Sequence, residues 1–561
     1  MNSNEDDNKY AKARNERQKF VLAILASPEH KKIVVAGPGT GKTYLFKTIL
    51  EGKKNTLTLT FVNSLVEDLS LELCGLSDVK TLHSFARSVV SKAKKSIRVF
   101  PKLSEVIKED ARVLLGEDID FDAIFHDRDD GNKHIDFYRK RKDYYDHYGY
   151  ADIVFAAVKY LEKEPSRVPI YEQILVDEFQ DFNKLEVSLI DALAAKSPVL
   201  LAGDDDQALY AFKKASADHI RGRHSGDDSE YEAFSLPYCS RCTRVIVDAI
   251  NDLLEGATGN DFLKSRITKE YKYLDDEEKD IESDKYPMIP YAQVFSKQIP
   301  WFIGSRIAKI AEDVRKNFSV LIISPTKTQC RLIAEALRNK GFQNVTFHDK
   351  HGEKEATLLD GLKILLDDDK SNLGWRIAAK SFLSEKVYKE LLADSAGDNA
   401  QPVYELVGND CKQEVKQFLK TLRAIRDGKE VDEAKLVAAL KGTEFGPHEM
   451  ARDALTEELV ASKRSGNPGI RKIPIKVTTI QSSKGLAEEY VFITHFDNQF
   501  FGGSEKRKLT DQDICNFLVS LTRARKQVFL ISSQKEDPTL LKWIKPERIE
   551  RIQLKIKATE Q

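Results

Sequence analysis

Cysteine is scarce in this chain of 561 residues, which contains six of them. Only Cys239 and Cys242 lie close together, and no second pair stands at a spacing that would complete a four-ligand metal site. The pattern argues against a disulfide framework and favours reduced thiols that bind no metal, as in a reducing cytoplasm.

Net charge is also nearly absent, because 88 Lys and Arg residues are balanced by 89 Asp and Glu residues. This balance attracts the whole chain to neither nucleic acid nor a membrane, so any polyanion site must be a local basic groove. Long apolar runs are missing and the first residues are polar and acidic, so we expect neither a membrane span nor a signal peptide. These absences predict a cytoplasmic or nuclear protein. At 561 residues the chain is too long for one hydrophobic core, so we expect roughly two to four domains.

The chain does contain a phosphate-loop pattern near its start. Apolar residues 33–35 run into small residues and then into a Lys-Thr pair that would open a helix. Glycines in such a turn let backbone N–H groups surround phosphates, and the helix N-terminus adds the positive end of its dipole. We expect Lys42 to hold the β- and γ-phosphates of ATP and Thr43 to bind Mg²⁺; a glycine-rich turn without a ligand is the alternative. The predicted loop consists of Ala36, Gly37, Pro38, Gly39, Thr40, Gly41, Lys42 and Thr43.

Two further predicted strands end in polar side chains. Residues 174–176 run into Asp177 and Glu178, and residues 198–202 run into the segment that contains Gln207. The carboxyl ends of parallel strands form the nucleotide sites of open α/β sheets. We therefore expect Asp177 to bind the same Mg²⁺ as Thr43, Glu178 to deprotonate the attacking water, and Gln207 to contact the γ-phosphate.

A basic segment lies between residues 90 and 165 and is predicted to be an inserted subdomain. One cluster runs from Lys92 to Arg98, and a second runs from Arg139 to Lys142 beside several tyrosines. Cations interleaved with aromatic rings suit a nucleic-acid strand, because they bind its phosphates and its bases. A solvated helix face explains the same pattern equally well.

The ordered motifs of the chain resemble those of the UvrD/Rep/PcrA group of superfamily 1 helicases. The resemblance extends from Gln18 to about Ser532. Its motifs are AGPGTGKT at 36–43, TFVN at 60–63, TLHSFA at 81–86, VDEFQD at 176–181, GDDDQALY at 203–210, CSRCTRVI at 239–246, TIQSSKGL at 479–486 and VSLTRARK at 519–526.

The resemblance implies an α/β fold, in which two RecA-like parallel-sheet lobes of a P-loop NTPase each carry a mainly helical insert. The first lobe would comprise residues 1–90 and 166–235, with its insert at 91–165. The second lobe would comprise residues 236–384 and 471–561, with its insert at 385–470. The acidic residues 275–278 are expected to form a surface loop of the second lobe.

The resemblance also implies how ATP and DNA are bound. ATP and Mg²⁺ would lie in the cleft between the lobes, where Gln18 reads the adenine edge. Arg241 and Arg523 would reach the γ-phosphate from the second lobe as arginine fingers. The residues implied on the DNA path are Phe61, Asn63, His83, Tyr210, Phe212 and Lys484.

Two positions near the nucleotide base depart from the family pattern. Tyr44 stands where an Arg commonly follows the phosphate loop, and Ser240 stands where an aromatic residue commonly precedes Arg241. Stacking on the base would then come from Tyr44 or Tyr238, or the preference for ATP over other nucleotides would be loose.

By resemblance, the function is that of an ATP-dependent DNA translocase or helicase moving 3′→5′ on single-stranded and tailed duplex DNA. The alternative is a nucleic-acid-stimulated ATPase that switches or loads a nuclease complex, as compact relatives do beside OLD-type nucleases in antiviral systems such as Gabija. Short inserts and the lack of a glycine-rich duplex-gripping motif in the second insert favour this alternative. An RNA-directed activity also stays open, although the motif sequences DEFQD and LTRAR favour DNA as the substrate.

Overall fold

The computed structural model describes residues 3–60, 63–94, 96–209, 214–227, 229–314, 317–349, 355–397, 399–426 and 473–553. The chain forms two compact units. Unit 1 comprises Met1–Phe85, Glu164–His351 and Gly469–Gln561, and unit 2 comprises Ala86–Lys163 and Gly352–Pro468. None of the described helices combines the length and the apolar character that a bilayer crossing requires.

The first lobe of unit 1 is built on a six-stranded parallel sheet with the strand order β3-β2-β4-β5-β1-β6. Its strands are β1 (Lys31–Ala36), β2 (Thr56–Thr60), β3 (Asp78–Thr81), β4 (Gln173–Val176), β5 (Val199–Gly203) and β6 (Glu232–Leu236). The central strands are buried on both faces, which explains their nearly continuous apolar sequences.

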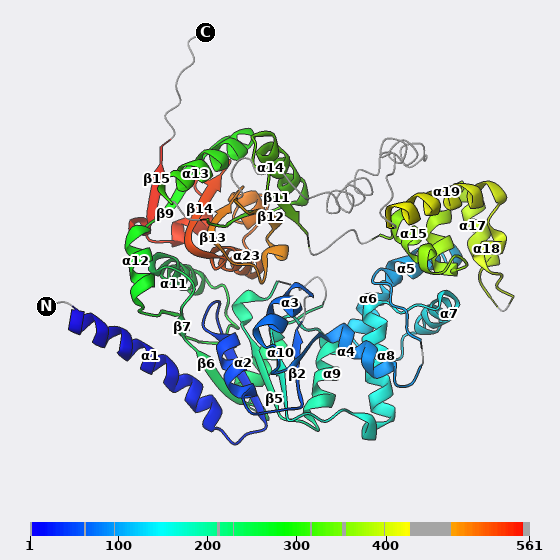
Figure 1. Cartoon of the computed structure of the whole chain (residues 1–561), viewed down its shortest axis with the longest axis horizontal. Helices are drawn as coiled ribbons and strands as arrows, with labels where there is room; N and C mark the ends of the chain where they lie inside the picture. The colour runs from blue at the N-terminus through cyan, green and yellow to red at the C-terminus, as the bar shows by residue number, and fades with distance from the viewer. Residues whose placement is uncertain are drawn as a thin grey trace, which may run out of the picture. The chain divides into compact units, whose positions relative to one another are not determined.

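Helices flank this first sheet (Figure 1). They are α1 (Ser3–Ala26), α2 (Lys42–Leu50), α3 (Asn63–Glu72), α4 (Leu82–Val90), α9 (Lys184–Ala194) and α10 (Asp218–Ser225). Val21 and Ile24 of α1 pack with Phe46 and Leu50 of α2 against the strands. These contacts anchor the C-terminal part of α1 to the first lobe.

The second lobe of unit 1 is built on a seven-stranded parallel sheet with the order β11-β12-β10-β13-β14-β9-β15. Its strands are β9 (Ile289–Gln293), β10 (Val320–Ser324), β11 (Val345–His348), β12 (Ile475–Thr479), β13 (Glu488–Ile493), β14 (Ala524–Ser532) and β15 (Ile549–Ile552). A separate parallel pair joins β7 (Tyr238–Cys239) to β8 (Lys272–Tyr273).

Helices cover both faces of the second sheet, so this lobe has three layers (Figure 1). They are α11 (Arg244–Gly259), α12 (Glu277–Lys285), α13 (Ile299–Asp313), α14 (Lys327–Asn339), α22 (Asn498–Phe501) and α23 (Asp511–Leu521). Ile246 of α11 and Leu518 of α23 belong to one core cluster, whereas Ile303 of α13 and Ile333 of α14 belong to another. The predicted α/β fold of two parallel-sheet, RecA-like lobes is confirmed.

The described residues of unit 2 are mainly helical, and the unit combines two separate chain segments, Ala86–Lys163 and Gly352–Pro468. Its helices are α5 (Leu103–Leu114), α6 (Phe121–His126), α7 (Ile135–Tyr145), α8 (Tyr150–Lys163), α15 (Leu358–Asp367), α16 (Asn372–Ala379), α17 (Glu385–Asp394), α18 (Val403–Leu406) and α19 (Asn409–Arg426). Val113, Leu114 and Tyr144 pack against the cluster formed by α15 to α19. The α15 and α16 segments, which the resemblance assigns to the second lobe, thus lie in unit 2. The six segment boundaries stay a prediction.

Candidate nucleotide site

Three loops meet at one edge of the first sheet. Strands β4, β5 and β1 are neighbours and run parallel, so the loops that follow them share an edge. The phosphate loop follows β1, Asp177 and Glu178 follow β4, and Asp204 to Gln207 follow β5. The sequence pattern therefore brings these segments together as expected for parallel strands.

The phosphate loop contains two glycines with left-handed backbones. Gly39 has φ +71° and Gly41, which precedes α2, has φ +96°. A Cβ at Gly39 would collide with the Cβ of Arg241, and one at Gly41 would collide with the guanidinium of Arg17. The left-handed conformation thus favours glycine at both positions, and close contact with Arg241 also requires it at Gly39, whereas the flexible Arg17 side chain could move away from Gly41.

Lys42 connects the phosphate loop to the acidic loop after β4. Lys42 Nζ donates to Glu178 Oε1 at 2.7 Å and lies 3.5 Å from Asp177 Oδ1. Burial disfavours the charge of Lys42, but Asp177 and Glu178 outweigh it and raise the pKa of Lys42. Burial also opposes the charge of Glu178, yet Lys42 and Lys484 lower the pKa of Glu178 well below its usual range. The carboxylate of Glu178 is therefore ionised at neutral pH.

Glu178 is also held in an unusual backbone conformation. Its φ of 55° places it in the left-handed region, which costs a residue other than glycine about 1–3 kcal/mol. Gln180 Nε2 donates to Glu178 Oε2 at 2.7 Å, and Gln180 Oε1 accepts from the backbone of Asp204 at 3.0 Å. Gln180 thus fixes the carboxylate against the next loop, a role the sequence interpretation missed although Gln180 lies in the DEFQD motif.

Side chains of the second lobe bind these same loops. Lys484 Nζ donates to Asp181 Oδ2 at 2.6 Å and to the backbone oxygen of Gln207 at 2.7 Å. Arg523 Nη2 donates to Gln207 Oε1 at 3.1 Å. Burial and the nearby charge of Arg241 lower the pKa of Arg523 to about 10, so it remains charged at neutral pH. Gln207 is thus the point where Arg523 contacts the first lobe.

A pocket of about 320 Å³ lies over the phosphate loop. It is lined by Gly37, Gly39, Thr40, Gly41, Lys42, Thr43, Ser240, Arg241, Lys279 and Arg525. Arg241 was predicted at this place, whereas Lys279 and Arg525 were not. Arg525 could have been suspected because it lies two residues after Arg523, but Lys279 belongs to α12, a helix that the sequence interpretation missed.

The acidic residues 275–278 were predicted to be a loop, and this prediction was wrong for Glu277 and Glu278, which begin α12, whereas Asp275 and Asp276 precede the helix. The Asp276 side chain caps α12 by accepting from the backbone of Lys279 at 3.4 Å. Asp280 of the same helix pairs with Lys9 of α1 at 2.8 Å and with Arg244 at 3.0 Å. The helix forms because capping and ion pairs with distant residues offset its excess of like charge.

The residues predicted to bind Mg²⁺ fit a divalent cation by their chemistry. Asp177 Oδ1 is buried and has no hydrogen-bond partner among the described residues. Thr43 lines the pocket at the start of α2, and its hydroxyl is the kind of oxygen ligand that Mg²⁺ accepts beside a carboxylate. A buried carboxylate oxygen without a donor is what a cation or its bound water would use.

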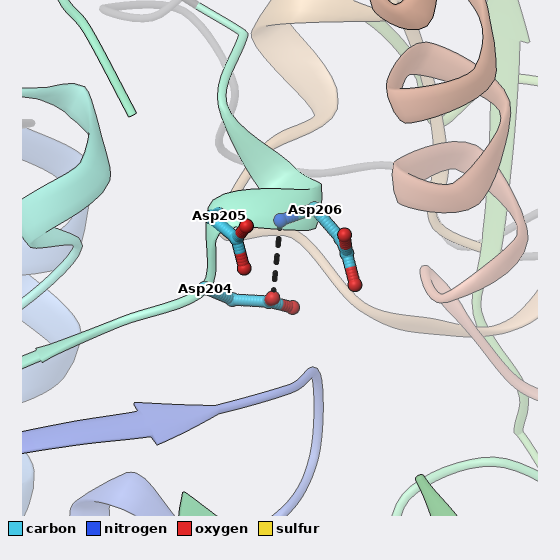
Figure 2. Close-up of side chains that lie close together, drawn as sticks. All are labelled: Asp204, Asp205 and Asp206. Atoms are coloured by element: carbon cyan, nitrogen blue, oxygen red, sulfur yellow. Dashed lines mark hydrogen bonds between the residues drawn. The ribbon is translucent and has the colours of Figure 1, made fainter. Parts of the chain in front are cut away.

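A second acidic group consists of Asp204, Asp205 and Asp206, and its composition is that of a metal site. Figure 2 shows the three side chains close together. One carboxylate oxygen from each lies within 4.8 Å of the other two. Lys269 Nζ, however, lies 2.7, 2.6 and 2.8 Å from Asp204, Asp205 and Asp206. Arg266 pairs with Asp206 at 2.7 Å and Arg221 pairs with Asp205 at 3.1 Å. Three cations therefore already balance the three carboxylates, which raise the pKa of Lys269 against the opposing effect of burial.

The residues predicted around the base contact one another at the side of the loop. Tyr44 OH donates to Gln18 Oε1 at 3.2 Å, and Arg17 lies over the Tyr44 ring at 5.4 Å. Ser240 donates from its backbone to Gly39 O at 2.9 Å. Tyr238 packs edge-on against Phe20 at 6.0 Å. Neither tyrosine lines the pocket.

Two further residues of the predicted phosphate loop have structural contacts. The backbone oxygen of Pro38 accepts from Tyr271 OH at 2.9 Å, and Ala36 is buried at the end of β1.

The predicted DNA-path residues are only partly visible in the described parts of the chain. Phe61, Tyr210 and Phe212 lie outside the described residues. Asn63 begins α3. His83 Nε2 lies 3.9 Å from Glu186 Oε1. Lys484 is buried on the acidic loop, so any contact with a strand would require its ammonium to leave Asp181.

The basic cluster from Arg139 to Lys142 divides into exposed and structural members. Arg139 and Lys140 are exposed, whereas Arg141 is buried and donates from Nε to Asp110 Oδ2 at 2.8 Å. Lys142 lies over the Tyr148 ring at 4.2 Å. At most half of the cluster is therefore available to a nucleic-acid strand.

Comparison with known proteins supports the motif resemblance. The family described as UvrD/REP helicase N-terminal domain matches residues 126–225. DNA helicase II of Haemophilus influenzae is 28% identical over 221 residues, which cover 38% of this chain and 28% of that protein. ATP-dependent DNA helicase PcrA of Staphylococcus aureus is 23% identical over 275 residues, which cover 40% of this chain and 38% of that protein.

A longer match is to the probable DNA helicase II homolog of Mycoplasma pneumoniae. It is 23% identical over 601 residues and covers 89% of this chain and 81% of that protein. The chain thus spans little more than a quarter of the Haemophilus relative but most of the Mycoplasma one. With the two parallel sheets and the ordered motifs, these matches support a likeness of the chain to UvrD/Rep/PcrA helicases.

Proposed function

We propose that this chain is an ATP-dependent DNA translocase or helicase of 3′→5′ polarity that hydrolyses ATP in the pocket over the phosphate loop. One observation carries the proposal: Lys42 and Arg241, from the two lobes of unit 1, line the same pocket. Among the described residues the Arg241 side chain makes no ion pair or hydrogen bond, so its charge is available to a phosphate. The names of the relatives support DNA as the nucleic acid.

In this proposal, Lys42 exchanges its partner when ATP binds. Its ammonium now pairs with Glu178 at 2.7 Å, and the β- and γ-phosphates would compete for it. Because Lys42 is a main cause of the low pKa of Glu178, its withdrawal would raise that pKa. Glu178 would then be a stronger base toward the attacking water, held in position by Gln180.

Mg²⁺ bound by Thr43 and Asp177 would neutralise charge on the phosphates. Arg241 would stabilise the negative charge that develops on the γ-phosphate. Arg523 and Lys484 contact the first lobe through Gln207 and Asp181, so closure of the lobes and occupancy of the pocket would be coupled through these contacts. A strand that favours the closed arrangement would thereby stimulate hydrolysis.

The proposal is tested by measuring ATP hydrolysis and strand displacement on 3′-tailed, 5′-tailed and blunt DNA and on matched RNA. We expect hydrolysis that rises with DNA, and displacement that requires the 3′ tail. Displacement from the 5′ tail would contradict the polarity, and stimulation by RNA alone would contradict the choice of DNA. Hydrolysis without displacement would favour the alternative of an ATPase switch or loading subunit.

A further inference from the structure

Arg525 is a cation in the nucleotide pocket that the proposed chemistry does not use. It is the second residue of β14 and is exposed while it lines the pocket. Among the described residues its side chain makes no hydrogen bond or ion pair. The adjacent Lys526 instead pairs with Glu489 at 2.7 Å and does not line the pocket. The Arg525 side chain is therefore available to bind a ligand, and it makes no polar contact with the described residues that would stabilise the fold.

The other lining residues are engaged or belong to the phosphate end. Lys42 and Thr43 lie on the loop, and Arg241 lies beside Gly39. Ser240 is bound to Gly39 O, and Lys279 is bound to Glu282 at 2.6 Å. Arg525 is the one exposed residue of this lining. With the phosphates on the loop, as the proposed function has it, the base and ribose would extend away from the loop toward the exposed part of the pocket.

No aromatic ring is among the residues that line this pocket in the described parts of the chain. A planar guanidinium can replace a ring, because arginine stacks on π-faces and keeps its charge. Such a contact accepts any base, since every base has a π-face.

On the basis of the proposed function, we propose that Arg525 stacks on the nucleobase and makes the site a weakly base-selective nucleoside triphosphate site. Arg525 is then a base-binding residue without base preference, distinct from the predicted fingers Arg241 and Arg523. Its contact should strengthen nucleotide binding by about three- to thirtyfold, the range of a cation–π contact at a partly desolvated site.

The test is equilibrium binding by calorimetry of the β,γ-imido analogues of ATP and GTP, and of inorganic tripolyphosphate, all with Mg²⁺. The variants are Arg525→Ala, Arg525→Lys and the neighbouring control Lys526→Ala. We expect Arg525→Ala and Arg525→Lys to weaken both nucleotides about three- to thirtyfold and to leave tripolyphosphate within about twofold. The wild type should bind the two analogues within about tenfold of each other, and Lys526→Ala should bind like the wild type.

Equal loss of tripolyphosphate, or full retention of binding by Arg525→Lys, would overturn stacking in favour of a charge contact. Unchanged nucleotide binding by Arg525→Ala would also overturn it, as would a preference above about a hundredfold between the analogues. Lys42→Ala separates this inference from the proposed function. If Lys42→Ala binds all three ligands normally, the pocket is not the nucleotide site; if it loses them while Arg525→Ala does not, only the stacking inference fails.

Discussion

The buried charges of unit 2 should matter far more for stability than their exposed neighbours on the same helix. Arg141 donates to Asp110 at 2.8 Å, and Arg376 donates to the other oxygen of Asp110 at 2.9 Å. Arg376 also pairs with Glu109 at 2.9 Å. Arg141, Asp110 and Arg376 are 3%, 0% and 1% exposed, so solvent cannot replace a lost partner.

The geometry predicts how much stability each substitution should cost and in which order the substitutions should rank. Breaking a buried ion pair costs about 3–5 kcal/mol, because one charge is left without compensation. Asp110→Ala leaves Arg141 without a carboxylate among the described residues, so we expect about 5 kcal/mol. Arg141→Ala leaves Asp110 paired with Arg376, so we expect about 3 kcal/mol. Lys140→Ala, on the exposed side of the same helix, should change stability by no more than about 0.5 kcal/mol.

Tryptophan fluorescence can follow this unit alone. The chain has three tryptophans, and Trp375 in unit 2 is buried beside Arg376. In a Trp301→Phe, Trp543→Phe background, urea unfolding followed by Trp375 reports on unit 2. The reasoning is refuted if Lys140→Ala costs as much as Arg141→Ala, or if Asp110→Ala is as stable as the parent.

Three more outcomes follow from other sites. Burial raises the pKa of Asp152 to about 7, whereas an aspartate in an unfolded chain has a pKa of about 3.9. Between these two values the folded state binds a proton that the unfolded state has released. The free energy of unfolding of unit 2 should therefore fall by up to about 4 kcal/mol as pH rises from 4 to 7. Asp152→Asn should remove this loss in urea titrations at pH 5 and 8. Lys269→Met should lower the melting temperature as much as Lys269→Ala, because the charge of Lys269, and not its length, compensates the carboxylates that Arg221 and Arg266 leave unbalanced. Arg523→Ala should abolish stimulation of ATP hydrolysis by oligo-dT while the circular dichroism spectrum stays unchanged; equal stimulation would contradict its role between the lobes.

The phosphate loop and the acidic strand ends were predictable because their geometry is local. Apolar strands in a parallel sheet deliver their following residues to one edge, so Lys42 and Glu178 meet because β1 and β4 both pair with β5. The residue types at those positions then restrict the chemistry. The roles of the individual site residues remain predictions for the experiments above.

The remaining features depend on contacts between residues far apart in the chain. Lys279 enters the pocket only because α12 forms, and α12 is held by Lys9 and Arg244 through Asp280. No local sequence pattern predicts ion pairs between residues so far apart in the chain.

The burial of Arg141 did leave a signal that the sequence analysis passed over. Tyr138, Arg141 and Tyr145 recur at helical spacing on one face of α7, and all three are buried. A run of basic residues on a helix thus divides by face, and only the face away from the aromatic residues is available to a ligand.

The central claim is that the pocket over the phosphate loop hydrolyses ATP with Glu178 as the base. It is tested most directly by measuring, for Glu178→Gln, both steady-state ATP hydrolysis with oligo-dT and equilibrium binding of the β,γ-imido analogue of ATP. Removal of a general base costs about a hundredfold or more in rate, while the loop and the cation ligands stay intact. We therefore predict loss of hydrolysis with binding retained, whereas Lys42→Ala loses both. Hydrolysis by Glu178→Gln at nearly the wild-type rate would contradict the account.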